Sequence, residues 1–62
     1  MSTAVAAAIR ERARSVWRSL QAARRDNDAH GTLLAADEWD EVTRLARAHG
    51  VNLDEVTGEG HH

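Results

Sequence analysis

Apolar side chains recur every three or four residues along the first part of the chain. The positions with this spacing are Val5, Ile9, Ala13, Val16, Leu20 and Ala23. Such spacing places them on one face of an α-helix, with Trp17 at the edge of that face. Ser2 or Thr3 can cap the start of the helix. The pattern therefore predicts an amphipathic helix of about 22–27 residues, or about 35–40 Å in length.

The end of this first helix has two interpretations. Residues 26–28, Asp-Asn-Asp, are typical of a loop between helices. Alternatively, Ala29 and His30 form a last helical turn and Gly31 follows it in the left-handed conformation that often ends a helix. The sequence leaves both interpretations open.

A second, shorter helix is predicted to begin between Leu34 and Asp37. Four acidic residues between positions 37 and 41 then fall in its first turns, where the helix dipole favours negative charge. Gly50 is expected to end the helix by adopting a left-handed conformation. The predicted buried face consists of Trp39, Val42, Leu45, Ala46 and His49.

After Gly50, Asn52 is expected to cap a single helical turn from Leu53 to Val56. The segment from position 43 to position 56 is Thr43-Arg44-Leu45-Ala46-Arg47-Ala48-His49-Gly50-Val51-Asn52-Leu53-Asp54-Glu55-Val56. This stretch resembles the closing helix and following turn of Cro/C1-type repressor domains, whose usual pattern is L-A-x-x-x-G-V-S-L-D-E-L. Asn52 replaces the usual serine, and His49 replaces an apolar residue. In that family the segment packs beneath the DNA-reading helices and touches no bases, so the resemblance implies local structure more than function.

A complete helix-turn-helix is an alternative interpretation of the same stretch. Its reading helix would then offer Asn52, Asp54, Glu55 and Thr57, with no Arg or Lys. Two carboxylates facing phosphates are repulsive, and Gly58 cuts the helix after about one turn. We therefore disfavour this interpretation.

The predicted fold class is all-α. No stretch shows the alternation of apolar and polar residues that marks a strand. We expect a helical hairpin in which residues 1–57 form one domain, with a long first helix, a shorter second helix and a one-turn third helix. Residues 58–62, Gly-Glu-Gly-His-His, are expected to be a disordered tail or the remnant of a purification tag.

Composition changes this picture by suggesting association. The chain has 62 residues, and 42% of them are apolar, but twelve of these are alanine. Small chains without metals or disulfides often gain stability by forming oligomers. The first predicted helix is longer than the second, which leaves its N-terminal end exposed. We therefore expect a homodimer that forms a four-helix bundle and covers this end. The predicted partner or dimer interface consists of Val5, Ile9, Val16, Trp17, Leu20 and Trp39.

Charge is distributed unevenly along the chain. Residues 1–25 hold six Arg and one Glu, whereas residues 26–62 hold two Arg and nine acidic residues. The residues that could contact nucleic acid are Arg10, Arg14, Arg18, Arg24 and Arg25. The alternative, which we favour, is that the basic and acidic helices complement each other. A net charge of −2 for the whole chain also argues against autonomous DNA binding.

Several chemical functions find no support in the sequence. The chain has no cysteine, so it can form neither a disulfide nor a thiolate metal site. His30 and His49 lack a histidine partner at the spacing of metal ligands, and Ser15 and Ser19 have no histidine at helical spacing to activate them. We therefore predict no enzymatic activity, no catalytic residues, no cofactor and no metal.

The longest apolar run, Ala4 to Ile9, is too short to span a membrane. We predict a cytoplasmic, non-enzymatic interaction or regulatory protein that self-associates and docks an unidentified protein partner. The alternative is a nucleic-acid-binding accessory protein that uses the arginines of the first helix.

Overall fold

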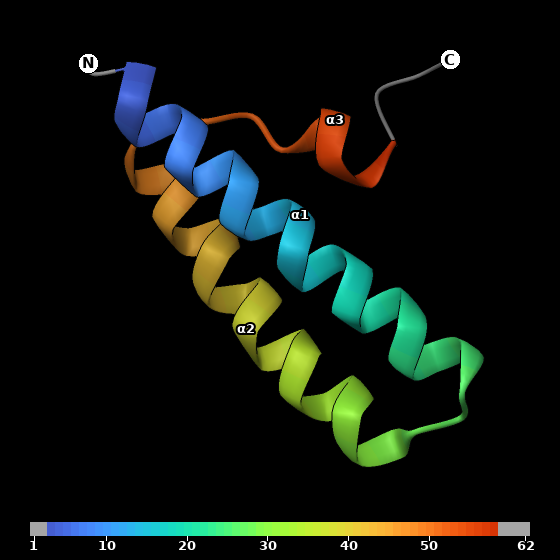
Figure 1. The fold of residues 1–62 in the computed structure, drawn as a ribbon. Coiled ribbons are helices and arrows are strands. Elements are labelled where there is room, and N and C mark those ends of the chain that lie inside the picture. The colour runs from blue at the N-terminus through green and yellow to red at the C-terminus, as the bar shows by residue number, and fades with distance from the viewer. Residues whose placement is uncertain (1–2, 59–62) are drawn as a thin grey trace.

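The computed structural model describes residues 3–58, which form three helices (Figure 1). Helix α1 spans Thr3–Arg25, α2 spans Ala29–Ala48 and α3 spans Asp54–Thr57. Helices α1 and α2 run antiparallel and side by side. The described residues contain no strand, so the predicted all-α helical hairpin is confirmed. Of the expected tail, residues 59–62 lie outside the described residues.

The loop interpretation of residues 26–28 is correct. Asn27 has a φ of 54°, in the left-handed region that Asn tolerates better than most residues with a side chain. The Asn27 N–H donates to the carbonyl of Arg24 at 3.2 Å, and the Asp28 N–H donates to the carbonyl of Ala23 at 2.9 Å. These two bonds satisfy carbonyls at the end of α1 and reverse the chain.

The predicted start of the second helix, between Leu34 and Asp37, is wrong, because α2 begins at Ala29. Asp28 is its N-cap: one oxygen of its carboxyl group accepts a hydrogen bond from the Gly31 N–H at 2.9 Å. Gly31, which the alternative interpretation placed after a helix end, therefore lies in the first turn of α2. A capping carboxylate contributes about 1 kcal/mol, which offsets the cost of a glycine in a helix.

Gly50 follows α2 with a φ of 66°, as predicted. The Gly50 N–H donates to the carbonyl of Arg47 at 3.2 Å, and the Val51 N–H donates to the carbonyl of Ala46 at 2.8 Å. The pattern of two hydrogen bonds that ends α1 thus also ends α2, and it turns the chain back toward α1. His49, predicted to lie on the buried face, is the half-buried C-cap residue of α2.

Helix α3 begins one residue later than predicted, at Asp54 instead of Leu53. The side-chain oxygen of Asn52 accepts a hydrogen bond from the Asp54 N–H at 2.8 Å, so Asn52 does stabilise the turn. Gly58 ends the helix with a φ of 77°. The predicted order of a helix, a glycine stop and a helical turn is therefore confirmed with a shift of one residue. The predicted N-cap is wrong, because Leu53 and not Asn52 is the N-cap of α3.

The core lies between α1 and α2, and every buried residue of the described chain is apolar. The buried residues are Ile9, Ala13, Val16, Leu20 and Ala23 of α1, Ala35, Val42 and Ala46 of α2, and Val51. Alanines on both helices permit a close approach of the two backbones. Of the residues predicted to be buried on the second helix, Val42 and Ala46 are confirmed. The prediction that Leu45 is buried is wrong, because Leu45 is 40% exposed.

The segment after α2 covers the N-terminal part of the apolar face of α1. Val51 packs with Ile9 and Ala46, and the partly buried Ala6 and Leu53 pack against these three. From the sequence, this end of the first helix was expected to be covered by a second chain. Because α2 has 20 residues and Val51 folds back, the single chain already covers Ile9.

The helical hairpin is a thin molecule, with extents of 39 × 26 × 15 Å. Among the helices of residues 3–58, none combines the length and the apolar character needed to cross a membrane.

Candidate interaction surface

One side of the hairpin carries the two tryptophans. The rings of Trp17 and Trp39 have centroids 5.1 Å apart, and both residues are half-buried. Thr43 lies one helical turn beyond Trp39 and lines a small hollow together with residues 51–54. We call the side marked by these three residues the tryptophan face. The segment after α2 lies against one end of it.

The other side is marked by an ion pair between α1 and α2, with 3.6 Å between Nη2 of Arg12 and Oε2 of Glu41. Residues at helical spacing from this pair share its side of each helix. They are Ala8, Arg12, Ser15 and Ser19 on α1, and Leu34, Glu38, Glu41 and Leu45 on α2. We call these eight residues the open face. All eight are exposed, including Leu34 at 53% and Leu45 at 40%.

The two halves of the open face are aligned across the hairpin. Both helices place its residues at steps of four, three and four, and the helices are antiparallel. Counting residues along each helix from the Arg12–Glu41 pair therefore places Leu45 and Ala8 at the same height along the helix axes. We call two residues at the same height level with each other. The same count puts Glu38 level with Ser15 and Leu34 level with Ser19. Large residues of α2 thus lie beside small residues of α1.

The six residues of the predicted interface occupy different environments. Ile9, Val16 and Leu20 are buried inside the single chain. Trp17 and Trp39 come together as a half-buried pair, and Val5 is 39% exposed. Three of the six residues are therefore buried within the hairpin, and two more contact each other across it. The prediction that these six form an interface stays untested.

Leu34 and Leu45 were not among the interface residues predicted from the sequence. Their signal was present, because they share one helical face at steps of four, three and four with two glutamates. This pattern was not recognised for two reasons. The second helix was expected to begin at or after Leu34, and Leu45 was assigned to the core. Only the position of Arg12 against Glu41 shows which side of the hairpin this face occupies.

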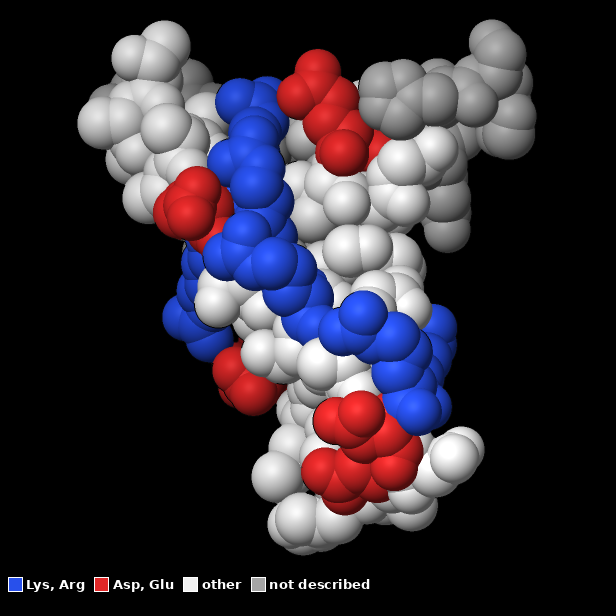
Figure 2. Space-filling model, turned by 45° about the vertical axis from the view of Figure 1, so that its right-hand side comes forward, with Lys and Arg blue, Asp and Glu red and all other residues white. Residues whose placement is uncertain are grey.

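Five of the six arginines of α1 form a band along this helix. Figure 2 shows this band crossing the molecule, with acidic groups on both sides of it. The band consists of Arg10, Arg14, Arg18, Arg24 and Arg25, of which all but Arg10 are exposed. Nη1 of Arg14 lies 3.3 Å from Oε2 of Glu11. Within residues 3–58, the other four arginines of the band form no ion pair.

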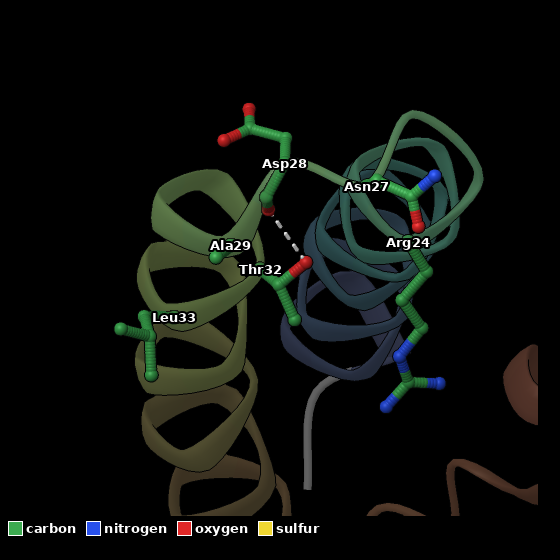
Figure 3. A pocket seen from close by; sticks show the side chains of 6 residues that line it. All are labelled: Arg24, Asn27, Asp28, Ala29, Thr32 and Leu33. Carbon is green, nitrogen blue, oxygen red and sulfur yellow. Dashed lines mark hydrogen bonds between the residues drawn. The ribbon is translucent and has the colours of Figure 1, made fainter.

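A hollow of about 530 Å³ lies at the hairpin turn and is open to solvent (Figure 3). It is lined by Arg24, Asn27, Asp28, Ala29, Thr32 and Leu33. The Thr32 hydroxyl donates a hydrogen bond to the Asp28 carbonyl at 2.8 Å, and Leu33, 68% exposed, points away from α1. These lining residues do not pair a nucleophile with a base. The hollow therefore offers a contact surface and no evident reaction chemistry.

No group of three or more His, Cys, Asp or Glu side chains within residues 3–58 is placed to hold a metal ion. Comparison with known proteins finds no matching family model, no matching curated protein and no matching solved structure. The surfaces described above are therefore the basis for any statement about function.

Proposed function

We propose that this chain is a small non-enzymatic interaction protein that self-associates and presents its remaining surface to a protein partner. The observation that carries this proposal is the open face. It leaves Leu34 and Leu45 exposed on one side of the hairpin. Domains are commonly built from two packed layers of secondary structure around one core. Here the hairpin supplies one layer, and a second layer would cover the open face.

Association through this face has a clear energetic source. Full burial of a leucine side chain contributes about 1.5–3 kcal/mol, and both leucines of the open face are about half exposed. Covering the rest of each side chain contributes on the order of 1 kcal/mol. A symmetric contact includes each leucine twice, so the four leucines together contribute about 4 kcal/mol toward association.

Sedimentation equilibrium at micromolar concentrations tests self-association. We expect a mass of two chains of 6.8 kDa and a melting temperature that rises with protein concentration. A mass of one chain at every concentration, with a melting temperature independent of concentration, would contradict the proposal.

The second candidate function is binding of nucleic acid, and the arginine band is the observation that favours it. Four of its five arginines form no ion pair within residues 3–58, so they are free to meet phosphates. The acidic groups beside the band oppose this function because they repel the same phosphates. We therefore rank it second.

A salt titration of binding to random duplex DNA separates the two candidates. Contacts from four arginines predict a slope of about −3 to −4 for the logarithm of the affinity against the logarithm of salt concentration. Replacing Arg10 and Arg18 with glutamine should reduce that slope by about two. The matched control replaces Arg44 and Arg47 of α2, which changes the net charge equally. Equal losses in both double variants, or no binding at low salt, would remove this candidate.

A further inference from the structure

We infer that the open face binds the open face of a second copy, about a two-fold axis parallel to the helices, so that α2 of each copy lies on α1 of the other. This inference rests on the proposed self-association and names its surface and register. It follows from two properties of the open face, its level side chains and the opposite charges of its two helices.

The first property is the alignment of large and small residues. Rotation about an axis parallel to the helices exchanges the two copies but keeps every residue at its own height. Residues that lie level across the hairpin therefore also oppose each other across the interface. Leu45 of one copy then covers Ala8 of the other, and Leu34 covers Ser19. Each exposed leucine meets a small residue, which leaves room for its side chain.

The second property is charge. Helix α1 carries six Arg and one Glu, whereas α2 carries four acidic residues and two Arg. In this arrangement Glu41 of each copy faces Arg12 of the other, beside the pair that Arg12 and Glu41 already form within one chain. Two arginines and two glutamates then alternate at the centre of the interface. Such complementarity selects one register over others.

The competing two-fold arrangement has an axis perpendicular to the helices. It places α1 on α1 and α2 on α2. Glu38 and Glu41 of one copy would then face the same two glutamates of the other, while the two copies of Arg12 approach each other. Like charges at an interface are unfavourable. The parallel axis avoids both repulsions and gives every helix antiparallel neighbours, as in four-helix bundles.

The surfaces outside the open face remain accessible in the proposed dimer. The tryptophan face lies on the opposite side of each hairpin, and the segment 51–57 stays with it. The arginine band lies outside the open face, and four of its five arginines are exposed. Self-association and binding of a further partner are therefore compatible.

Disulfide cross-linking tests the register cleanly, because the chain has no cysteine of its own. Two separate single-cysteine variants, Ser15→Cys and Glu38→Cys, are mixed and oxidised. These positions are exposed, level with each other and central in the open face. A disulfide requires Cα atoms within about 7 Å, so it forms only if the two positions oppose each other. We expect a covalent 15–38 dimer, identified by its mass.

The matched control mixes Arg14→Cys with Asp40→Cys. These positions are also exposed and level, but they lie on the outer sides of α1 and α2. We expect at least a tenfold lower yield of cross-linked product than from the first mixture. Ser15→Cys alone should also cross-link poorly, because the two copies of α1 lie diagonally across the bundle.

The outcomes distinguish this inference from the proposed function. Efficient cross-linking of Ser15→Cys to itself would overturn the parallel axis and support α1 packing on α1, while self-association would stand. Equal yields from the open-face mixture and its control would overturn the open face as the interface. A monomeric wild-type chain in sedimentation would overturn the proposed function itself.

Substitution of leucines gives a second readout. Leu34→Ser is expected to raise the dimer dissociation constant about tenfold or more, the factor that corresponds to 1.4 kcal/mol. The control is Leu33→Ser, which makes the same change at a more exposed leucine outside the open face. Circular dichroism of each variant confirms that the helices persist. Equal effects of the two substitutions would overturn the assignment of the interface.

Discussion

Trp17 of α1 and Trp39 of α2 pack against each other across the hairpin, with ring centroids 5.1 Å apart and ring planes inclined at 49°. They are the only aromatic residues in the chain apart from the histidines. Tilted aromatic pairs at this separation contribute about 0.5–1.5 kcal/mol beyond the area they bury. The pair therefore ties together two helices in which alanine takes four of the eight buried positions.

Trp39→Ala is expected to lower the free energy of unfolding by about 3 kcal/mol, toward the lower end of the range for large aromatic residues because Trp39 is only half-buried. The measurement is urea unfolding followed by circular dichroism. The control is Arg14→Ala, at an exposed position of α1, which is expected to change stability by less than about 0.5 kcal/mol. Similar unfolding midpoints for the two variants would contradict the role of the tryptophan pair.

Asp28→Ala is expected to destabilise the chain by about 1 kcal/mol, because it removes the side-chain acceptor for the Gly31 N–H at the start of α2. Asp28→Asn keeps an oxygen acceptor and should retain most of the stability. Thermal unfolding of both variants checks this prediction. If alanine and asparagine at position 28 had equal effects, the hydrogen bond would not be the source of the stabilisation.

Gly31→Ala should have an effect that depends on Asp28. Alanine normally favours a helix over glycine by about 1 kcal/mol. A Cβ at position 31, however, would lie 2.5 Å from Oδ2 of Asp28 and 3.4 Å from Cβ of Ala23. The carboxyl group must then turn away and loses its capping bond. We therefore expect little net change in the wild type and stabilisation of about 0.5–1 kcal/mol in the Asp28→Ala background. Equal effects in both backgrounds, measured by urea unfolding, would contradict the coupling.

Asn27 is the turn residue whose backbone conformation can be tested directly. Its φ of 54° lies in the left-handed region, which costs about 1–2 kcal/mol for most residues with a side chain. Asn27→Ala should therefore destabilise the chain by about 1 kcal/mol, whereas Asn27→Gly should be neutral or stabilising. Thermal unfolding of the two variants decides between this conformation and an ordinary right-handed turn, for which alanine would be the better residue.

The sequence by itself determined the helical elements and much of the core. The steps of three and four residues from Ile9 to Ala23 identify the buried face of α1, because a helix places such residues on one side whatever they pack against. Gly50 likewise ends α2, since its left-handed conformation depends on the local backbone. These features are local, so a short continuous segment of the sequence is enough to predict them.

The start of α2 and the free side of the hairpin were decided only by the tertiary structure. The same Gly31 that is suited to ending a helix is accepted in the first turn of α2, where Asp28 caps the helix and Ala23 lies close to it. Leu45 fits the apolar pattern of its helix but lies to one side of the contact line set by Ala35, Val42 and Ala46. Which side of an amphipathic helix is covered depends on the rotation of both helices and on the path of residues 51–57. Those relations join residues far apart in the chain, and helical periodicity alone cannot specify them.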